Sequence, residues 1–284
     1  MSSPVPLPSR TRARGAWRGL SAGRPSTAPR EQGPDPAVLD LVTDPFVSVD
    51  DAHRRLCALE SLFYERGDRR GPFLVIYSRV TAAVGRAIDD GAFVDPDWVD
   101  RYLVAFADLY RRALSCYETG RLAALADPWQ VAFEAAERGD CLVAQDAVLG
   151  INAHVNYDLA LALAEVGVDP ARADKYADHC AVNATLRRLV DEVQTRLAER
   201  YAPGLATVDE SLGRVDEAVS FLALAEGRDS AWRVATALAD SRFGVRRAVA
   251  LWYLRTVSTG TAYALLTPTR SRRLRASLSR LEHG

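Results

Sequence analysis

An apolar segment near the middle of the chain, residues 141–166, has the composition of a helix that is buried on most of its circumference. Four polar side chains interrupt it: Asn152, His154, Asn156 and Asp158. Each of them needs a partner inside the protein, because an unpaired buried polar group costs roughly 1–3 kcal/mol. The segment therefore has to lie inside the fold. We expect its four polar side chains either to fix the packing of neighbouring helices or to carry out chemistry.

Helix-start patterns recur along the rest of the chain. Ser48 followed by Asp51 is a capping box, and Gly71-Pro72 is a helix opening. Asp95-Pro96, Asp127-Pro128 and Asp169-Pro170 each combine an Asp cap with a proline in the first turn. These signals and the apolar spacing predict helices over residues 49–65, 72–89, 96–117, 128–138, 141–166, 172–201, 214–225, 228–240 and 245–264, with a short basic helix near the C-terminus. No stretch shows sustained strand alternation, so we expect an all-α protein with a single bundle-like domain over 37–284.

Composition narrows the setting. Residues 1–36 are rich in Pro, Ser, Arg and Gly and predict a disordered tail without the apolar core of a signal peptide. The net charge of −1 gives no reason to expect a nucleic-acid partner. No window approaches about 18 uninterrupted apolar residues, so we expect no membrane span. The four cysteines, which form no CxxC pair, favour reduced thiols and a cytoplasmic protein, and Lys175 as the sole lysine indicates an actinobacterial, high-GC genome.

His154 and Asp158 form the leading candidate site. They are four residues apart and share one helix face, whereas Asn152 and Asn156 lie on another. Two interpretations follow for the pair. In the first, the pair takes part in chemistry, either as two metal ligands or as a general base that a carboxylate orients. In the second, His154 is a core residue whose hydrogen-bonding need is met by its helical neighbour Asp158.

The following helix carries Asp178, His179 and Asn183. If it packs antiparallel to the central helix, Asp178 lies level with Asp158, and Asn183 lies level with His154. Carboxylate and imidazole groups that meet in a bundle core are the usual ingredients of a metal site. The candidate ligands for a divalent metal, the one cofactor considered, are therefore His154, Asp158, Asp178 and His179.

Further polar residues interrupt other apolar helices. Arg228 either clamps an anionic group or pairs with a core acid, and Asp229 is a helix-start carboxylate. Tyr77, Ser78, Arg79, Asp108 and Tyr110 are polar intrusions of the kind that usually serve as core hydrogen-bond partners. We predict that a substrate contacts Asn152, Asn156, Tyr157, Asn183, Arg228, Asp229 and Trp232.

The segment Gly150–Leu161, with Asn152-Ala153-His154-Val155-Asn156 and Asp158-Leu159, resembles the hallmark of domain-of-unknown-function family 5995. That hallmark reads G-(M/I)-N-A-H-I-N-H-D-L, and Tyr157 replaces its second histidine. The stretches 77–81, 106–110, 178–183 and 228–232 are similar to the family as well, so the resemblance covers most of residues 48–240. It implies a family of actinobacterial and haloarchaeal proteins without implying a reaction.

Two functions from different classes follow. The first is a helical enzyme of specialised metabolism whose buried His154–Asp158 site hydrolyses, isomerises or cyclises a mostly hydrophobic small molecule. The second is a non-catalytic binding or structural protein whose His, Asn and Asp side chains only lock helices together. A cavity of roughly 300 Å³ or more against His154 favours the enzyme, whereas closed packing favours the lock.

Overall fold

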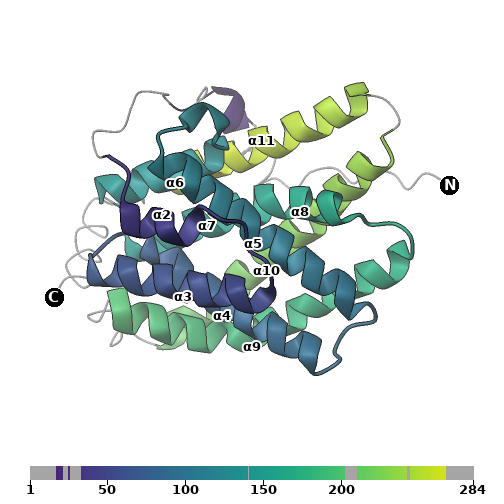
Figure 1. The fold of residues 1–284 in the computed structure, drawn as a ribbon, viewed down its shortest axis with the longest axis horizontal. Helices are drawn as coiled ribbons and strands as arrows, with labels where there is room; N and C mark the ends of the chain where they lie inside the picture. The colour runs from purple at the N-terminus through teal and green to yellow at the C-terminus, as the bar shows by residue number, and fades with distance from the viewer. Residues whose placement is uncertain are drawn as a thin grey trace.

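Residues 143–166 form the central helix, which lies within the array of helices drawn in Figure 1 and contacts five other described helices. The computed structural model describes residues 17–21, 25, 33–139, 141–201, 210–241 and 244–266, with the backbone alone over 210–223. Its elements are α2 (Pro36–Val42), α3 (Val49–Glu65), α4 (Gly71–Asp89), α5 (Pro96–Glu118), η1 (Leu122–Ala124), α6 (Asp127–Arg138), α7 (Val143–Ala153), η2 (His154–Asp158), α8 (Leu159–Val166), α9 (Arg172–Tyr201), α10 (Glu210–Ala239) and α11 (Gly244–Leu266). Every one of these described elements is helical, which confirms the all-α prediction.

The predicted helix over 141–166 is present as α7, η2 and α8 in direct succession. It contacts α4, α5, α6, α10 and α11, so partners cover it on several sides. Leu149, Ala153, Leu159, Ala160 and Leu163 have no exposed surface. Burial of this apolar stretch thus holds the polar residues of η2 in the interior.

Two helix starts are formed as the sequence predicts. The Ser48 side chain accepts the Asp51 N–H at 3.1 Å and begins α3, and the Asp95 side chain accepts the Trp98 N–H at 2.9 Å and begins α5. Asp35-Pro36 caps α2 in the same way, with the Ala37 N–H donating to Asp35 at 3.0 Å. We did not predict α2, although its start carries the same dipeptide pattern.

Other boundary predictions were wrong. At α6 the N-cap is Ala126, and Asp127 instead accepts two hydrogen bonds from Arg255. Asp169-Pro170, expected as a cap and first turn, instead forms a cis peptide ahead of α9, although α9 itself begins at Arg172 as its predicted range has it. Gly227 does not break a helix, because α10 runs through it without interruption. The short basic helix expected near the C-terminus lies outside the described residues.

The expected antiparallel pairing of α9 with the central helix is not formed. Instead α9 packs chiefly against α4, while α10 lies against α8 and η2. Two antiparallel helices joined by a short turn usually pack together, but here α10 returns from a distant part of the chain and occupies that face. Residues of α9 therefore do not reach His154 in the predicted register.

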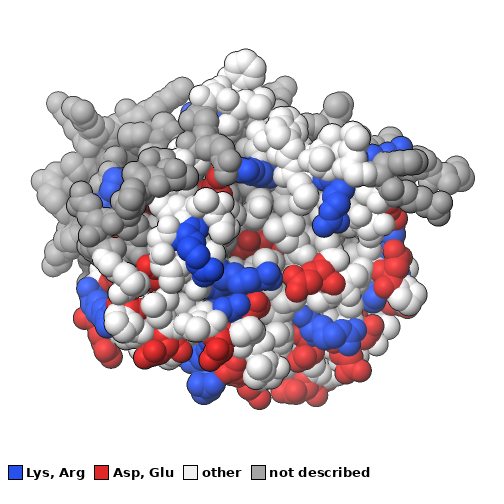
Figure 2. All heavy atoms as spheres, turned by 45° about the horizontal axis from the view of Figure 1, so that its top comes forward, with Lys and Arg blue, Asp and Glu red and all other residues white. Residues whose placement is uncertain are grey.

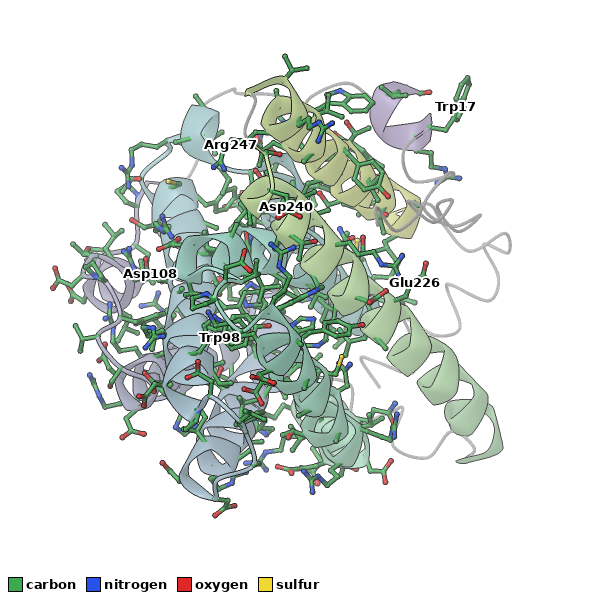
Figure 3. All side chains as sticks on the ribbon, turned by 90° about the vertical axis from the view of Figure 1, so that its right-hand side faces the viewer. Trp17, Trp98, Asp108, Glu226, Asp240 and Arg247 are labelled. Atoms are coloured by element: carbon green, nitrogen blue, oxygen red, sulfur yellow. The ribbon has the colours of Figure 1, made fainter. Side chains whose placement is uncertain are left out.

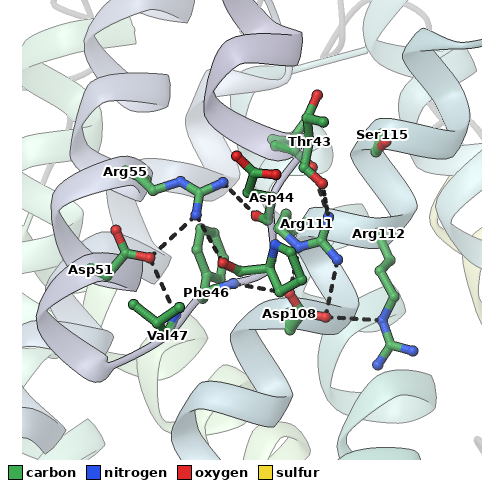
Figure 4. A network of polar contacts seen from close by, with 12 residues as sticks. Thr43, Asp44, Phe46, Val47, Asp51, Arg55, Asp108, Arg111, Arg112 and Ser115 are labelled. Carbon is green, nitrogen blue, oxygen red and sulfur yellow. Dashed lines mark hydrogen bonds and ion pairs between the residues drawn. The ribbon is translucent and has the colours of Figure 1, made fainter.

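Two arginines fasten the loop between α2 and α3 to the bundle (Figure 4). Arg55 donates to the carbonyl oxygens of Leu41 and Asp44, and Arg111 donates to those of Val42 and Thr43. Asp108 pairs with Arg111 and accepts the Phe46 N–H. Asp108 is thus a structural hydrogen-bond partner, as its sequence context suggested.

The surface carries mixed charge. On the face shown in Figure 2, basic and acidic side chains are interspersed. Residues Val143–Val166 are long and apolar enough to cross a membrane by length and composition, but 61% of their most apolar window is buried inside the fold, as in the core helix of a globular protein. Most of the predicted tail, 1–36, lies outside the described residues, although 17–21 form a helical turn on which Trp17 is 73% exposed (Figure 3).

Candidate functional site

His154 and Asp158 lie in a π-helical turn. Its wider hydrogen-bond pattern is defined by the Leu159 N–H, which donates to the carbonyl oxygen of His154 five residues earlier. Such turns inside α-helices occur frequently at functional sites. The turn leaves both side chains buried on one side of the central helix.

The imidazole, the carboxylate and an indole form a buried chain of hydrogen bonds. Nδ1 of His154 lies 3.1 Å from Oδ2 of Asp158, and Nε1 of Trp129 donates to the same oxygen at 2.7 Å. Burial lowers the pKa of His154 below its usual 6.5, and the bond to Asp158 only partly opposes this shift. Burial likewise raises the pKa of Asp158. A carboxylate only accepts hydrogen bonds, so Nδ1 carries the proton and the neutral imidazole keeps its lone pair on Nε2.

Aromatic rings surround this imidazole. Phe106 stacks on it with centroids 3.6 Å apart and an interplanar angle of 8°, and the Tyr77 ring meets it edge-on at 4.4 Å. The further rings that contact it are Phe73, Trp129 and Tyr110. We call these five side chains the aromatic cage; they come from α4, α5 and α6.

Three buried polar atoms lie inside the cage. Among the described residues, His154 Nε2 and the hydroxyls of Tyr77 and Tyr110 are buried without a hydrogen bond of ordinary length. Burial raises the pKa of both phenols, so they stay protonated and can donate. The arrangement offers one basic nitrogen and two neutral hydroxyl donors in an apolar enclosure, which is suited to acid–base chemistry.

Asn152 and Asn156 form hydrogen bonds outside the aromatic cage. Asn152 donates to the Ser258 carbonyl oxygen on α11 at 2.9 Å, and Asn156 donates to Asn152 Oδ1 at 3.0 Å. Burial raises the pKa of the half-buried Tyr157, and the positive charge of Arg255 partly opposes this shift. These three predicted substrate contacts are on the same segment as His154, but the bonds of the asparagines tie η2 and α7 to α11.

A second polar cluster lies at α9 and α10. Arg228 donates through Nε to Asn183 Oδ1 at 2.7 Å and through a terminal nitrogen to the His179 carbonyl oxygen at 2.7 Å. His179 Nε2 lies 3.1 Å from the Arg228 carbonyl oxygen. Trp232 packs on the His179 ring at 5.4 Å. The structure therefore brings Asn183, Arg228 and Trp232 together, beside His179.

Asp178 and Asp229 have other partners. Asp178 accepts the backbone N–H groups of Val94 and Asp95 at 2.7 and 2.8 Å, which fixes the loop before α5. Asp229 pairs with Arg233 and accepts the Tyr176 hydroxyl nearer the surface.

The four predicted metal ligands do not assemble. His154 and Asp158 bond to each other, Asp178 caps a loop, and His179 contacts Arg228. Within the described part of the chain, no three His, Cys, Asp or Glu side chains come together as a ligand set.

A surface hollow of about 440 Å³ lies away from this site, between α4 and α9. It is lined by Arg79, Asp191, Glu192, Thr195, Arg196 and Glu199 and does not include His154. His154 itself is 2% exposed. His154 is thus enclosed by packed side chains, which is the arrangement expected of a helix-locking role, and a ligand can reach the imidazole only if a covering helix moves.

The sequence analysis missed four residues of the site: Phe73, Phe106 and Trp129 of the aromatic cage, and Tyr102, which stacks on Phe106. Trp98, Tyr102, Phe106 and Tyr110 recur every four residues, a spacing that places them on one face of α5 and could have predicted an aromatic wall. Trp98 of this wall has no exposed surface and lies well inside the helix packing (Figure 3). Trp129 could have been considered because a buried indole N–H needs an acceptor.

Comparisons with known proteins identify the family of this chain. A family model described as a family of unknown function (DUF5995) matches residues 49–268, which include both polar clusters. The comparison with curated proteins and the comparison with solved structures found no match. Since the match spans well over half of the sequence, the chain belongs to the family of unknown function DUF5995.

Proposed function

We propose that the protein is an enzyme in which His154 acts as an acid–base group on a small, mostly apolar molecule. The observation that carries the proposal is the unpartnered Nε2 of a buried imidazole whose Nδ1 is held by Asp158. A histidine that only locks helices would be expected to use both nitrogens. His179 is the internal contrast, because its Nε2 lies 3.1 Å from a carbonyl oxygen and its Nδ1 lies 3.5 Å from Arg228.

The neighbouring groups support distinct roles. Asp158 orients the imidazole and stabilises its charge after protonation, and Trp129 holds Asp158 in place. The hydroxyls of Tyr77 and Tyr110 are available to donate hydrogen bonds to a polar group of the substrate. The apolar walls of the aromatic cage favour a flat, largely hydrophobic substrate.

Access is part of the proposal. Both α10 and α11 contact η2, and His154 is closed off in this conformation. The side chains that enclose His154 itself come from α4, α5 and α6, so substrate entry requires displacement of one of these three helices. Lids of this kind exclude water during the reaction.

Proton abstraction by His154 can be tested with nitrobenzisoxazole, a flat and mostly apolar probe. A base takes its C–H proton, that electron pair forms the nitrile, and the N–O bond breaks to give a phenolate. We expect the wild-type protein to accelerate this reaction, His154→Gln to abolish the acceleration, and His179→Gln to retain it. The rate should be half-maximal below pH 6.5 and constant above, because burial lowers the pKa of His154.

A second candidate is a structural role for the His154 cluster. The tight stacking on Phe106 and the 2% exposure favour it. It predicts no acceleration by the wild-type protein, and effects of His154→Gln on stability alone. Either finding would contradict the proposed enzyme.

A further inference from the structure

The positive charge of Arg228 is buried without a negative partner among the described residues. The residue is 4% exposed and lies in the interior of α10, more than ten residues from either end. Its guanidinium donates to the Asn183 side chain and the His179 carbonyl oxygen, and it lies 3.5 Å from both the Tyr102 hydroxyl and His179 Nδ1. Among the described residues, no carboxylate lies within ion-pair distance of its guanidinium.

Other buried arginines of the same protein are compensated. Arg55 pairs with Asp51 and Arg111 pairs with Asp108, as Figure 4 shows. A buried charge without a counter-ion is costly, and proteins normally pair it. The sequence left open whether Arg228 pairs with a core acid or binds an anion. A core acid paired with Arg228 is not found among the described residues.

The groups around Arg228 are neutral. Burial, together with the charge of Arg228, lowers the pKa of His179 well below its usual value. Burial raises the pKa of Tyr102, so its phenol keeps its proton. None of these neighbours supplies a negative charge.

Arg228 adjoins the aromatic cage. Tyr102, which faces its guanidinium, precedes Phe106 by one turn of α5, and Phe106 stacks on His154. The preceding residue, Gly227, lies directly against η2, since a Cβ there would come 2.8 Å from Asn156 Oδ1. Arg228 and His154 are thus linked through the Tyr102–Phe106 pair.

We propose that Arg228 binds an anionic group, a carboxylate or a phosphate, of the molecule whose apolar body occupies the His154 site. This inference rests on the proposed function, because it concerns the same substrate. It adds a negative charge on that substrate, which the proposed function does not require. A guanidinium presents parallel N–H donors that match either kind of oxyanion. Asn183 orients this guanidinium through Nε.

Three probes with one apolar body separate the possibilities: octanoate, octyl phosphate and octanol. We expect calorimetry to show that the wild-type protein binds at least one of the two anions about tenfold or more tightly than octanol. The stronger anion identifies the head group. Arg228→Gln should remove the preference, and Arg246→Gln, which changes an exposed arginine of α11, should preserve it.

Equal affinity for anions and octanol, absence of anion binding, or a preference that survives in Arg228→Gln would overturn the inference. If Arg228→Gln does not fold, Asn183→Ala takes its place and should weaken the preference. His154→Gln should keep the preference while losing proton abstraction. Anion preference without catalysis would thus contradict the proposed function alone, and catalysis without anion preference would contradict this inference alone.

Discussion

Gly150 is a position where one added methyl group should disturb the candidate site. A Cβ at this residue would lie 2.6 Å from Cγ of Phe73 and 2.7 Å from its Cβ and Cδ2. The Phe73 ring is held between Tyr77, Tyr110 and Trp129, with centroids 5.3–5.5 Å away. It therefore has little room to move when Gly150 is replaced by Ala.

The expected size of the effect combines two opposing contributions. Overpacking of a well-filled core costs about 1–3 kcal/mol. Replacing a helical glycine by alanine returns up to about 1 kcal/mol of helix propensity. Since the added Cβ would lie within 2.7 Å of three Phe73 atoms, the overpacking cost should be about 2–3 kcal/mol, and we expect Gly150→Ala to lower the free energy of unfolding by ~1–2 kcal/mol in total.

Gly85→Ala is the matched control. It lies in α4, and its added Cβ would meet a single atom, Cγ1 of Val49, at 3.0 Å. The helix gain should there offset the contact, with a change within about 0.5 kcal/mol. Urea unfolding followed by circular dichroism measures both variants, and a Gly150→Ala protein as stable as wild type would refute the tight packing described for Phe73.

Three further predictions concern stability. Asp158→Ala should cost ~2–4 kcal/mol, because it leaves the buried N–H groups of Trp129 and His154 without an acceptor, whereas Asp158→Asn should cost less in the same urea titration. Asp178→Ala should lower the free energy of unfolding by ~2–4 kcal/mol, because two hydrogen bonds to backbone N–H groups are lost. Asp191→Ala, at an exposed position of the same helix, should leave stability unchanged. Equal effects of the two substitutions in thermal unfolding would contradict the capping role of Asp178. The folded-state pKa of His179 is depressed, so the unfolded chain binds the proton more tightly and stability is lost as pH falls below 6.5, with a slope of up to about 1.4 kcal/mol per pH unit from this residue. Unfolding titrations between pH 7 and 5 should show a shallower slope in His179→Gln, and an unchanged slope would argue against a buried neutral His179.

Local sequence patterns predicted the helices well where local energetics decide. The apolar segment 141–166 is the central helix, and Ser48 and Asp95 cap helices as their side chains allow. Local patterns failed where tertiary contacts competed. Arg255 binds the carboxylate of Asp127, and the approach of α10 to η2 keeps Gly227 within a continuous helix.

The candidate site was predictable in part. Spacing along one helix predicted the His154–Asp158 bond, because four residues bring two side chains together within a single element. The partners from other helices were not predictable in this way. Trp129 and Phe106 reach His154 only through the packing of α5 and α6, and the expected contribution of α9 failed because α10 covers the central helix instead.

The protonation of His154 tests the account most directly. Nitrogen NMR of the protein labelled with ¹⁵N-histidine, assigned by comparison with His154→Gln, reports which ring nitrogen carries the proton. At pH 7 we predict a neutral ring with the proton on Nδ1, a bare Nε2 and a titration midpoint below 6.5. A protonated Nε2, or a midpoint at or above 6.5, would contradict the claim that a buried and unpartnered base lies at the centre of this fold.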